Sequence, residues 1–224
     1  MNNQTRILLP TILFFIAAIA DVYGIIFANE TVKVIAKPML LTLLVVVYLV
    51  AVKEPLFWYV LGMFLCFIGD VLLMFNGANF FMFGLAAFLL GHVVYIKVTS
   101  MFLPSNITMK MISSAFPFVV FFAVLMYVLY PNLEELQIPV FVYGITISTF
   151  GAIALLNYRS EKSTENLWLL IGALLFILSD SILALNKFYK PNEIYAVAIM
   201  VTYILAQFLI CKAMIVKTNA VVSN

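Results

Sequence analysis

Three acidic side chains stand inside long apolar runs, where they could act as proton donors, proton acceptors or proton relays. Asp70 lies in FIGDVLLMF, Asp180 lies in FILSDSILALNKF, and Asp21 follows the run ILFFIAAIA. A carboxylate at bilayer depth costs about 2.5–3.5 kcal/mol on insertion scales, so it persists mainly where it is paired, hydrated or functional. We therefore expect Asp70 and Asp180 to be functional, against the plainer interpretation of buried hydrogen-bond partners. Asp21 is either a packing residue paired with Lys37 or a further member of the site.

Other polar side chains are expected at or near the same depth. Lys37 opens the second apolar span, and Lys187 lies seven residues, or two helical turns, after Asp180. Asn186 adds a hydrogen-bonding group beside Lys187. These residues predict a polar cavity that opens to the outer side, with carboxylates at its floor and lysines at its mouth.

Four further residues are candidates for lining this cavity. His92, the only histidine, lies one turn before Tyr95, and Tyr203 and Gln207 are one turn apart in the last span. A histidine bonded to a neighbouring helix, or a pair that ties two helices together, would have the same sequence pattern.

The composition indicates what kind of molecule must position these groups. Of the 224 residues, 66% are hydrophobic and only 10% are charged. Soluble domains are about 45–50% apolar and about 25% charged, so this composition predicts an integral membrane protein. The net charge of +2 gives no indication of nucleic-acid binding.

The hydropathy pattern predicts an all-α fold with eight transmembrane helices in one integral-membrane domain, residues 1–224. A helix needs about 20 apolar residues to cross about 30 Å of hydrocarbon. The expected spans are 7–27, 34–52, 57–76, 79–99, 110–130, 138–158, 166–187 and 193–215. Each of the three acids then lies six or seven residues before the outer end of its span, about 9–10 Å below that boundary.

The basic residues predict the orientation. Eight of the 12 Lys and Arg residues lie on the side of the N-terminus, which favours both termini on the cytoplasmic side. The run after Arg6 also has features of a signal peptide, but a first transmembrane helix keeps the hairpins evenly paired.

Several motifs together resemble the YhhN-like family, whose characterised members are lysoplasmalogenases. The matching segments are Lys37–Pro38, GDVLLMF (69–75), FGLAAFLLGHVVY (83–95), GALLFILSDSILALNKF (172–188) and YILAQFLI (203–210). The resemblance implies an eight-helix membrane enzyme that hydrolyses the vinyl ether bond of lysoplasmalogens. The products would be a fatty aldehyde and glycerophosphocholine or glycerophosphoethanolamine.

That reaction needs one protonated acid and one ionised carboxylate, as in glycosidases, which also pass through an oxocarbenium-like state. Two acids in one low-dielectric cavity cannot both ionise cheaply, so one stays protonated and the other is ionised. We therefore expect Asp70 and Asp180 to be the catalytic pair. Lys37 and Lys187 would hold the substrate phosphate, and His92 and Tyr95 would orient water or substrate. No metal or cofactor is expected, the partners are the lysolipid, water and membrane lipids, and a bacterial inner membrane is the expected location.

Three other classes remain as alternatives. A proton-coupled or small-molecule transporter also uses intramembrane acids, but would distribute them along a path through the bilayer. An intramembrane aspartyl protease would need GxGD where this chain has FIGD, and a YD partner that is missing here. In a non-catalytic scaffold, the Asp–Lys pairs would only lock helices together.

Overall fold

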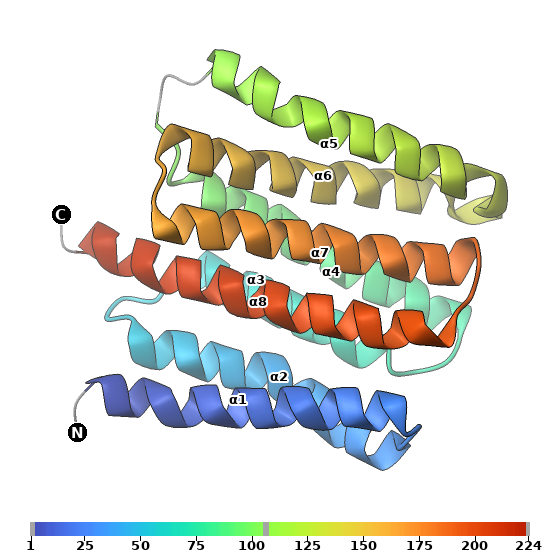
Figure 1. Ribbon diagram of the computed structural model, residues 1–224, viewed down its shortest axis with the longest axis horizontal. Coiled ribbons are helices and arrows are strands. Elements are labelled where there is room, and N and C mark those ends of the chain that lie inside the picture. The colour runs from blue at the N-terminus through green and yellow to red at the C-terminus, as the bar shows by residue number, and fades with distance from the viewer. Residues whose placement is uncertain (1–2, 105–107, 223–224) are drawn as a thin grey trace. The chain divides into compact units, whose positions relative to one another are not determined.

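The structure is a computed structural model that describes residues 3–104 and 108–222. Within these residues every regular element is helical (Figure 1). The α-helices are α1 (Asn3–Ile26), α2 (Glu30–Ala51), α3 (Phe57–Leu72), α4 (Ala78–Ser100), α5 (Thr108–Leu129), α6 (Gln137–Ser160), α7 (Thr164–Phe188) and α8 (Glu193–Val222). Two single-turn 3-10 helices, Tyr130–Asn132 and Glu134–Leu136, join α5 to α6.

Seven of the described helices are long and apolar enough to cross a membrane. The exception is α3, whose 16 residues extend about 24 Å at 1.5 Å per residue, less than the thickness of the hydrocarbon core. The all-helical prediction is confirmed, and each of the eight predicted spans coincides with one α-helix. A count of eight membrane crossings stays a prediction.

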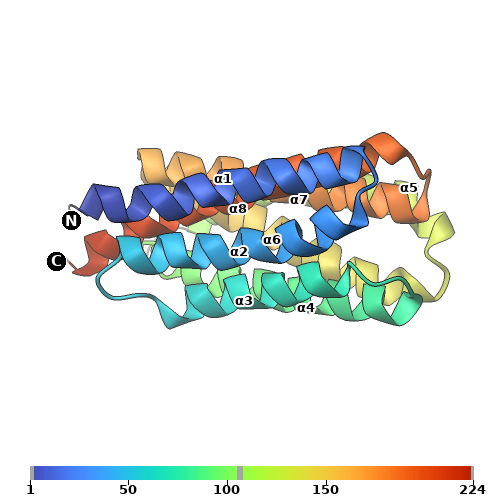
Figure 2. The same cartoon turned by 90° about the horizontal axis from the view of Figure 1, so that it is seen from below.

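The chain divides into two compact units, of which unit 1 comprises residues 1–94 and 214–224. In it α1 and α2 form an antiparallel hairpin and lie side by side (Figures 1 and 2). The last turns of α8 are tied to the end of α2, because the hydroxyls of Tyr48 and Thr218 lie 3.0 Å apart. Asn219 also donates to the Ala51 carbonyl at 3.1 Å. The first turn of α1 and the last turn of α8 lie at one end of this unit (Figure 1).

Small residues bring α3 and α4 close together within unit 1. A Cβ atom added at Gly69 would lie 2.5 Å from the Phe88 ring, and one at Gly91 would lie 2.9 Å from Cys66 Sγ. Real Cβ atoms do not approach so closely, so only glycine permits these two contacts. They set α4, with His92, against the helix that contains Asp70.

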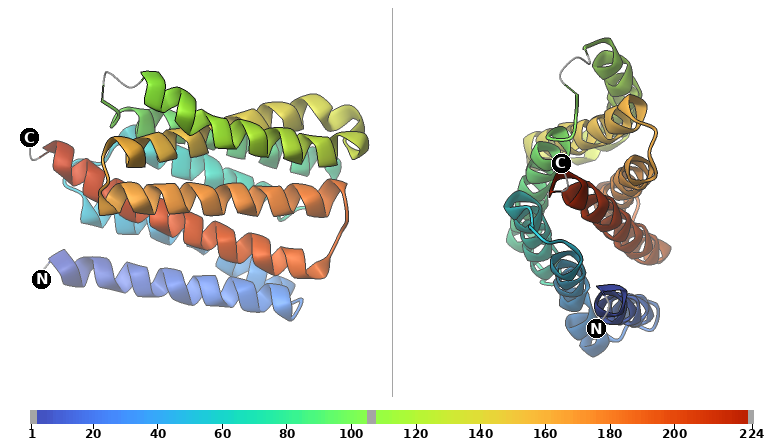
Figure 3. Two further views of the ribbon diagram at one scale, coloured as in Figure 1. Left: turned by 45° about the horizontal axis from the view of Figure 1, so that its top comes forward. Right: turned by 90° about the vertical axis from the view of Figure 1, so that its left-hand side faces the viewer.

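Unit 2 comprises residues 95–213 and is built around α5, α6 and α7, which lie side by side (Figures 1 and 3). Gly151 of α6 lies against Phe118 of α5 and Ile177 of α7, and Gly172 of α7 lies against Ile210 of α8. Its core includes Phe150, Ala154 and Phe176, which have no accessible surface. The expectation of a single domain over residues 1–224 stays a prediction.

Two predicted boundaries differ from the structure. The third span was expected to reach residue 76, but α3 ends at Leu72, because the next amides bond three residues back: Met74 N to Val71 O and Phe75 N to Leu72 O, both at 3.2 Å. Asp70 is therefore two residues from the end of its helix. Lys37 was expected to open the second span, yet it lies two turns inside α2, which begins at Glu30.

The early start of α2 has a local cause. The side-chain oxygen of Asn29 accepts a hydrogen bond from Val32 N at 3.1 Å, which satisfies one of the unpaired amides of the first turn. Glu30 then places a negative charge at the positive end of the helix dipole. The cap, rather than the first long apolar run, decides where the helix begins.

Candidate functional site

Asp180 lies on α7 in unit 2 and is held by a tyrosine from the neighbouring helix. The hydroxyl of Tyr143, on α6, donates to Asp180 Oδ2. Tyr143 is 9% exposed and Asp180 is half-buried, so the bond is partly shielded from water. The preceding residue, Ser179, donates to the Ile199 carbonyl of α8 at 3.0 Å. Asp180 is thus fixed between α6 and α8 by its own bond and by that of its neighbour.

Three of the predicted site residues meet in a second cluster of unit 2. Tyr95 donates to Gln207 Oε1 at 3.0 Å, and Gln207 Nε2 donates to the Tyr203 hydroxyl at 3.4 Å. All three side chains are buried. The Tyr203 ring packs edge-on against Phe176, with centroids 5.4 Å apart. The sequence predicted the pair on α8, and the structure joins it to Tyr95 of α4.

Asp70 and His92 both belong to unit 1 and are almost wholly removed from solvent. Asp70 is 3% exposed and His92 has no accessible surface. A charged group at such a position is costly unless hydrogen bonds or opposite charges stabilise it, which is why an intramembrane acid is a functional candidate.

The third acid has a different environment in unit 1. Asp21 is 1% exposed, and neither carboxylate oxygen has a hydrogen-bond partner among the described residues. Lys37 and Lys33 of α2 interact with it electrostatically, without a direct bond. Lys33 pairs with Glu30 at 2.8 Å. Lys37 is half-buried, and the expected Asp21–Lys37 pair is therefore a long-range interaction rather than a contact.

The residues at the end of α7 are partly engaged in the turn to α8. Asn186 Oδ1 accepts a hydrogen bond from Asn192 N at 2.8 Å, which stabilises that turn. Lys187, in the last turn of α7, is exposed. It lies seven residues after Asp180, about 10 Å along the helix and on the same face.

Tyr143 was not among the residues predicted for the site. Nothing in the segment QIPVFVYGITIS distinguishes this tyrosine from the other aromatic residues of an apolar span.

The two acids predicted to be catalytic lie in separate units, Asp70 in unit 1 and Asp180 in unit 2. Their action as a pair stays a prediction. Among the described residues, no group of three or more His, Cys, Asp and Glu could hold a metal ion.

Seven described helices that are long and apolar enough to cross a membrane define a multi-pass integral membrane protein. The chain belongs to the YhhN family, whose sequence profile matches residues 32–214, so the family expected from the motifs is confirmed.

Two curated relatives, from Mycobacterium bovis and Mycobacterium tuberculosis, are both named lysoplasmalogenase. Each is 32% identical to this chain over 160 residues, which are 68% of this chain and 58% of the relative. The chain therefore covers less than two thirds of the length of these relatives. No solved structure matches it.

Proposed function

We propose that this protein is a lysoplasmalogenase, which hydrolyses the vinyl ether bond of a lysoplasmalogen in the membrane. The observation that carries the proposal is one acid in each unit within the segment that matches the YhhN family: Asp70, which is buried, and Asp180, which is half-buried and hydrogen-bonded to Tyr143. The names of the two mycobacterial relatives agree with it. The substrate would be a choline or ethanolamine lysoplasmalogen, and the co-substrate is water.

The chemistry requires one proton donor and one water-activating base. A carboxylic acid transfers its proton to the β-carbon of the vinyl ether, and the α-carbon and ether oxygen become an oxocarbenium ion. Water adds to the α-carbon and loses a proton to the second carboxylate. The resulting hemiacetal then breaks its carbon–oxygen bond. The ether oxygen takes the proton from the second carboxylic acid and leaves as the glycerophospho alcohol, while the hemiacetal hydroxyl gives its proton to the first carboxylate, which yields the fatty aldehyde and restores both groups. A carboxylate also stabilises the cation, as in glycoside hydrolysis.

The geometry around Asp180 favours the base role for this residue. The Tyr143 hydroxyl donates to Oδ2, which orients the carboxylate, and a donated hydrogen bond is strongest to the ionised, proton-accepting form. Asp70, the more deeply buried acid, is then the proton donor. Lys37 and Lys187 would hold the phosphate, and His92 and the Tyr95–Gln207–Tyr203 cluster would orient substrate.

An aldehyde-release assay tests the proposal. The purified protein is given a 1-alkenyl lysophospholipid, with the saturated 1-alkyl analogue as the unreactive control. Asp70→Asn and Asp180→Asn should each abolish aldehyde release, and the double variant should be no worse than either single one, because residues that act as a unit are non-additive. Glu193→Gln, an exposed acid at the start of α8, should keep full activity.

Aldehyde release that survives both Asp substitutions would disprove the acid pair. If the folded wild-type protein released no aldehyde from any vinyl ether lipid, the enzyme proposal would fail and the transporter alternative would be favoured.

A further inference from the structure

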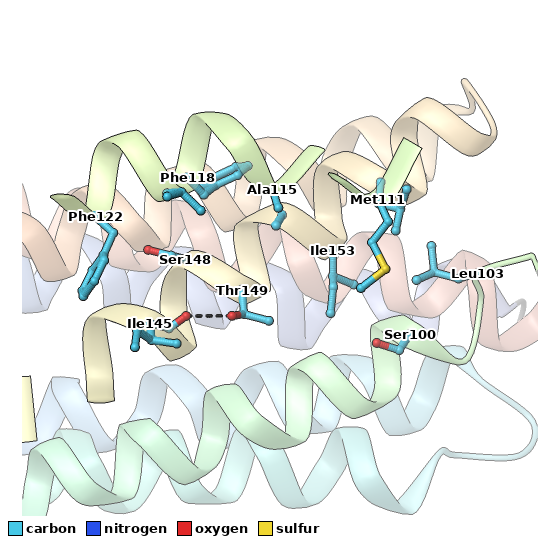
Figure 4. A pocket seen from close by; sticks show the side chains of 13 residues that line it. Ser100, Leu103, Met111, Ala115, Phe118, Phe122, Ile145, Ser148, Thr149 and Ile153 are labelled. Atoms are coloured by element: carbon cyan, nitrogen blue, oxygen red, sulfur yellow. Dashed lines mark hydrogen bonds between the residues drawn. The ribbon is translucent and has the colours of Figure 1, made fainter. Parts of the chain in front are cut away.

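An apolar groove runs between α5 and α6 in unit 2, beside the end of α4 (Figure 4). Its volume is about 380 Å³, within the range of about 300–1,000 Å³ that is typical of ligand sites. The walls are hydrocarbon, from residues that include Met111, Phe118, Ile145, Ile153 and Leu156. Among the polar atoms that line it, the Oγ of Ser148 is buried without a hydrogen-bond partner in the described part of the chain. Such a groove suits an acyl chain.

A polar cavity of about 390 Å³ adjoins the groove, since Leu103 lines both. It lies where α6 ends and α7 begins. Asn166, which is 2% exposed, donates through Nδ2 to the Glu161 carbonyl at 2.9 Å, which identifies Oδ1 as the acceptor atom. Within the described residues, Asn166 Oδ1 and Ser160 Oγ are buried without hydrogen-bond partners.

Unpaired buried acceptors are costly, so this cavity is suited to a ligand that donates hydrogen bonds. The exposed carboxylate of Glu161 also lines it and favours a donor with positive charge.

A cation lies at the same end of the groove. Arg159 follows Leu156 by one turn of α6, and its guanidinium donates to the hydroxyls of Ser113 at 2.9 Å and Ser114 at 3.4 Å. Arg159 forms no ion pair with any residue that the structure describes. A guanidinium has five N–H donors and binds phosphate well, so donors remain for an anionic group.

We propose that the groove and the polar cavity form one binding site for a membrane phospholipid with an ethanolamine headgroup. One acyl chain occupies the groove, the phosphate binds Arg159, and the primary ammonium donates to Asn166 Oδ1 and Ser160 Oγ beside Glu161. A choline headgroup has the same charge but no N–H to donate, so it satisfies neither acceptor.

This site is separate from the proposed chemistry. Along α7, Asn166 and Asp180 are 14 residues apart, about 21 Å. Binding therefore does not depend on vinyl ether hydrolysis, and it can be measured with ordinary diacyl lipids that have no vinyl ether bond.

The test is lipid binding to the full chain in detergent, measured by native mass spectrometry. The probes are dioleoyl phosphatidylethanolamine and dioleoyl phosphatidylcholine, which differ only in the headgroup. We expect about tenfold tighter binding of the ethanolamine lipid, the effect of a hydrogen bond to a charged group. Equal affinities for the two lipids would overturn the proposal.

Variants locate the site. Ser160→Ala should weaken binding of the ethanolamine lipid several-fold and leave binding of the choline lipid unchanged. Glu161→Gln and Arg159→Gln should weaken binding of both lipids, because each removes a charge that acts on both headgroups. The matched controls are Glu54→Gln and Lys162→Gln, exposed residues outside the groove and the cavity, which should change neither affinity. If the control variants lost as much lipid affinity as the site variants, the proposal would be overturned.

Ala152→Phe fills the groove and should weaken the binding of both lipids. Its control is Leu174→Phe, at an exposed position on α7. If Ala152→Phe does not fold, Ser160→Ala decides the question, because it removes one unpaired hydroxyl without adding bulk. Ethanolamine-lipid binding that Ser160→Ala leaves unchanged would contradict the proposed ammonium contact.

Discussion

Removal of one hydroxyl, in Tyr143→Phe, tests how Asp180 is positioned. The substitution keeps the ring, which is 9% exposed, and deletes only the donor to Asp180 Oδ2. A hydrogen bond to a charged group contributes about 1.5–3 kcal/mol, and each 1.36 kcal/mol is a factor of ten in rate. We therefore expect aldehyde release to fall by about 10- to 150-fold. If the bond orients the base rather than the lipid, kcat falls while KM changes little.

The assay is steady-state aldehyde release over a range of lysoplasmalogen concentrations, which gives kcat and KM, with the thermal unfolding midpoint measured in the same detergent. Tyr127→Phe is the matched control, because Tyr127 lies on α5 of the same unit and is 84% exposed. A folded Tyr143→Phe protein with activity within twofold of wild type would refute the positioning role. A raised KM with an unchanged kcat would instead assign Tyr143 to lipid binding.

Three further predictions concern stability, each measured as a shift in the thermal unfolding midpoint of the purified protein. Asp21→Asn should stabilise the protein by about 1 kcal/mol, since it removes a buried charge whose oxygens accept no hydrogen bond from a described residue. A lower midpoint would show that the attraction of Lys37 and Lys33 for the Asp21 carboxylate exceeds the cost of burying that charge. Gly172→Ala should destabilise by about 1–3 kcal/mol, because its Cβ would lie 2.8 Å from Ile210 Cγ1; an unchanged midpoint would mean that α7 and α8 separate easily. Tyr48→Phe should cost about 1–3 kcal/mol, because the Thr218 hydroxyl loses a partner 3.0 Å away; no loss would argue against the tie between α2 and α8.

Helix positions were largely predictable because hydropathy and length define membrane spans. The fourth span was expected at 79–99, and α4 runs over Ala78–Ser100. The wrong helix boundaries were those that hydropathy does not set. Asn29 and Glu30 form a readable helix start that would have placed Lys37 inside α2. The end of α3 at Leu72 has no such signal, because the next residues are also apolar.

The sequence by itself determined the class of protein, the family, the eight helices and the three acids that lie within them. Only the tertiary structure decided which side chains meet: Tyr143 with Asp180, and Tyr95 with Gln207. The reason is physical. In a helix that is apolar on all sides, the pattern does not indicate which face meets a neighbour. The rotation of each helix about its axis is then set by close packing, for example at Gly151 and Gly172, and that rotation selects the polar partners.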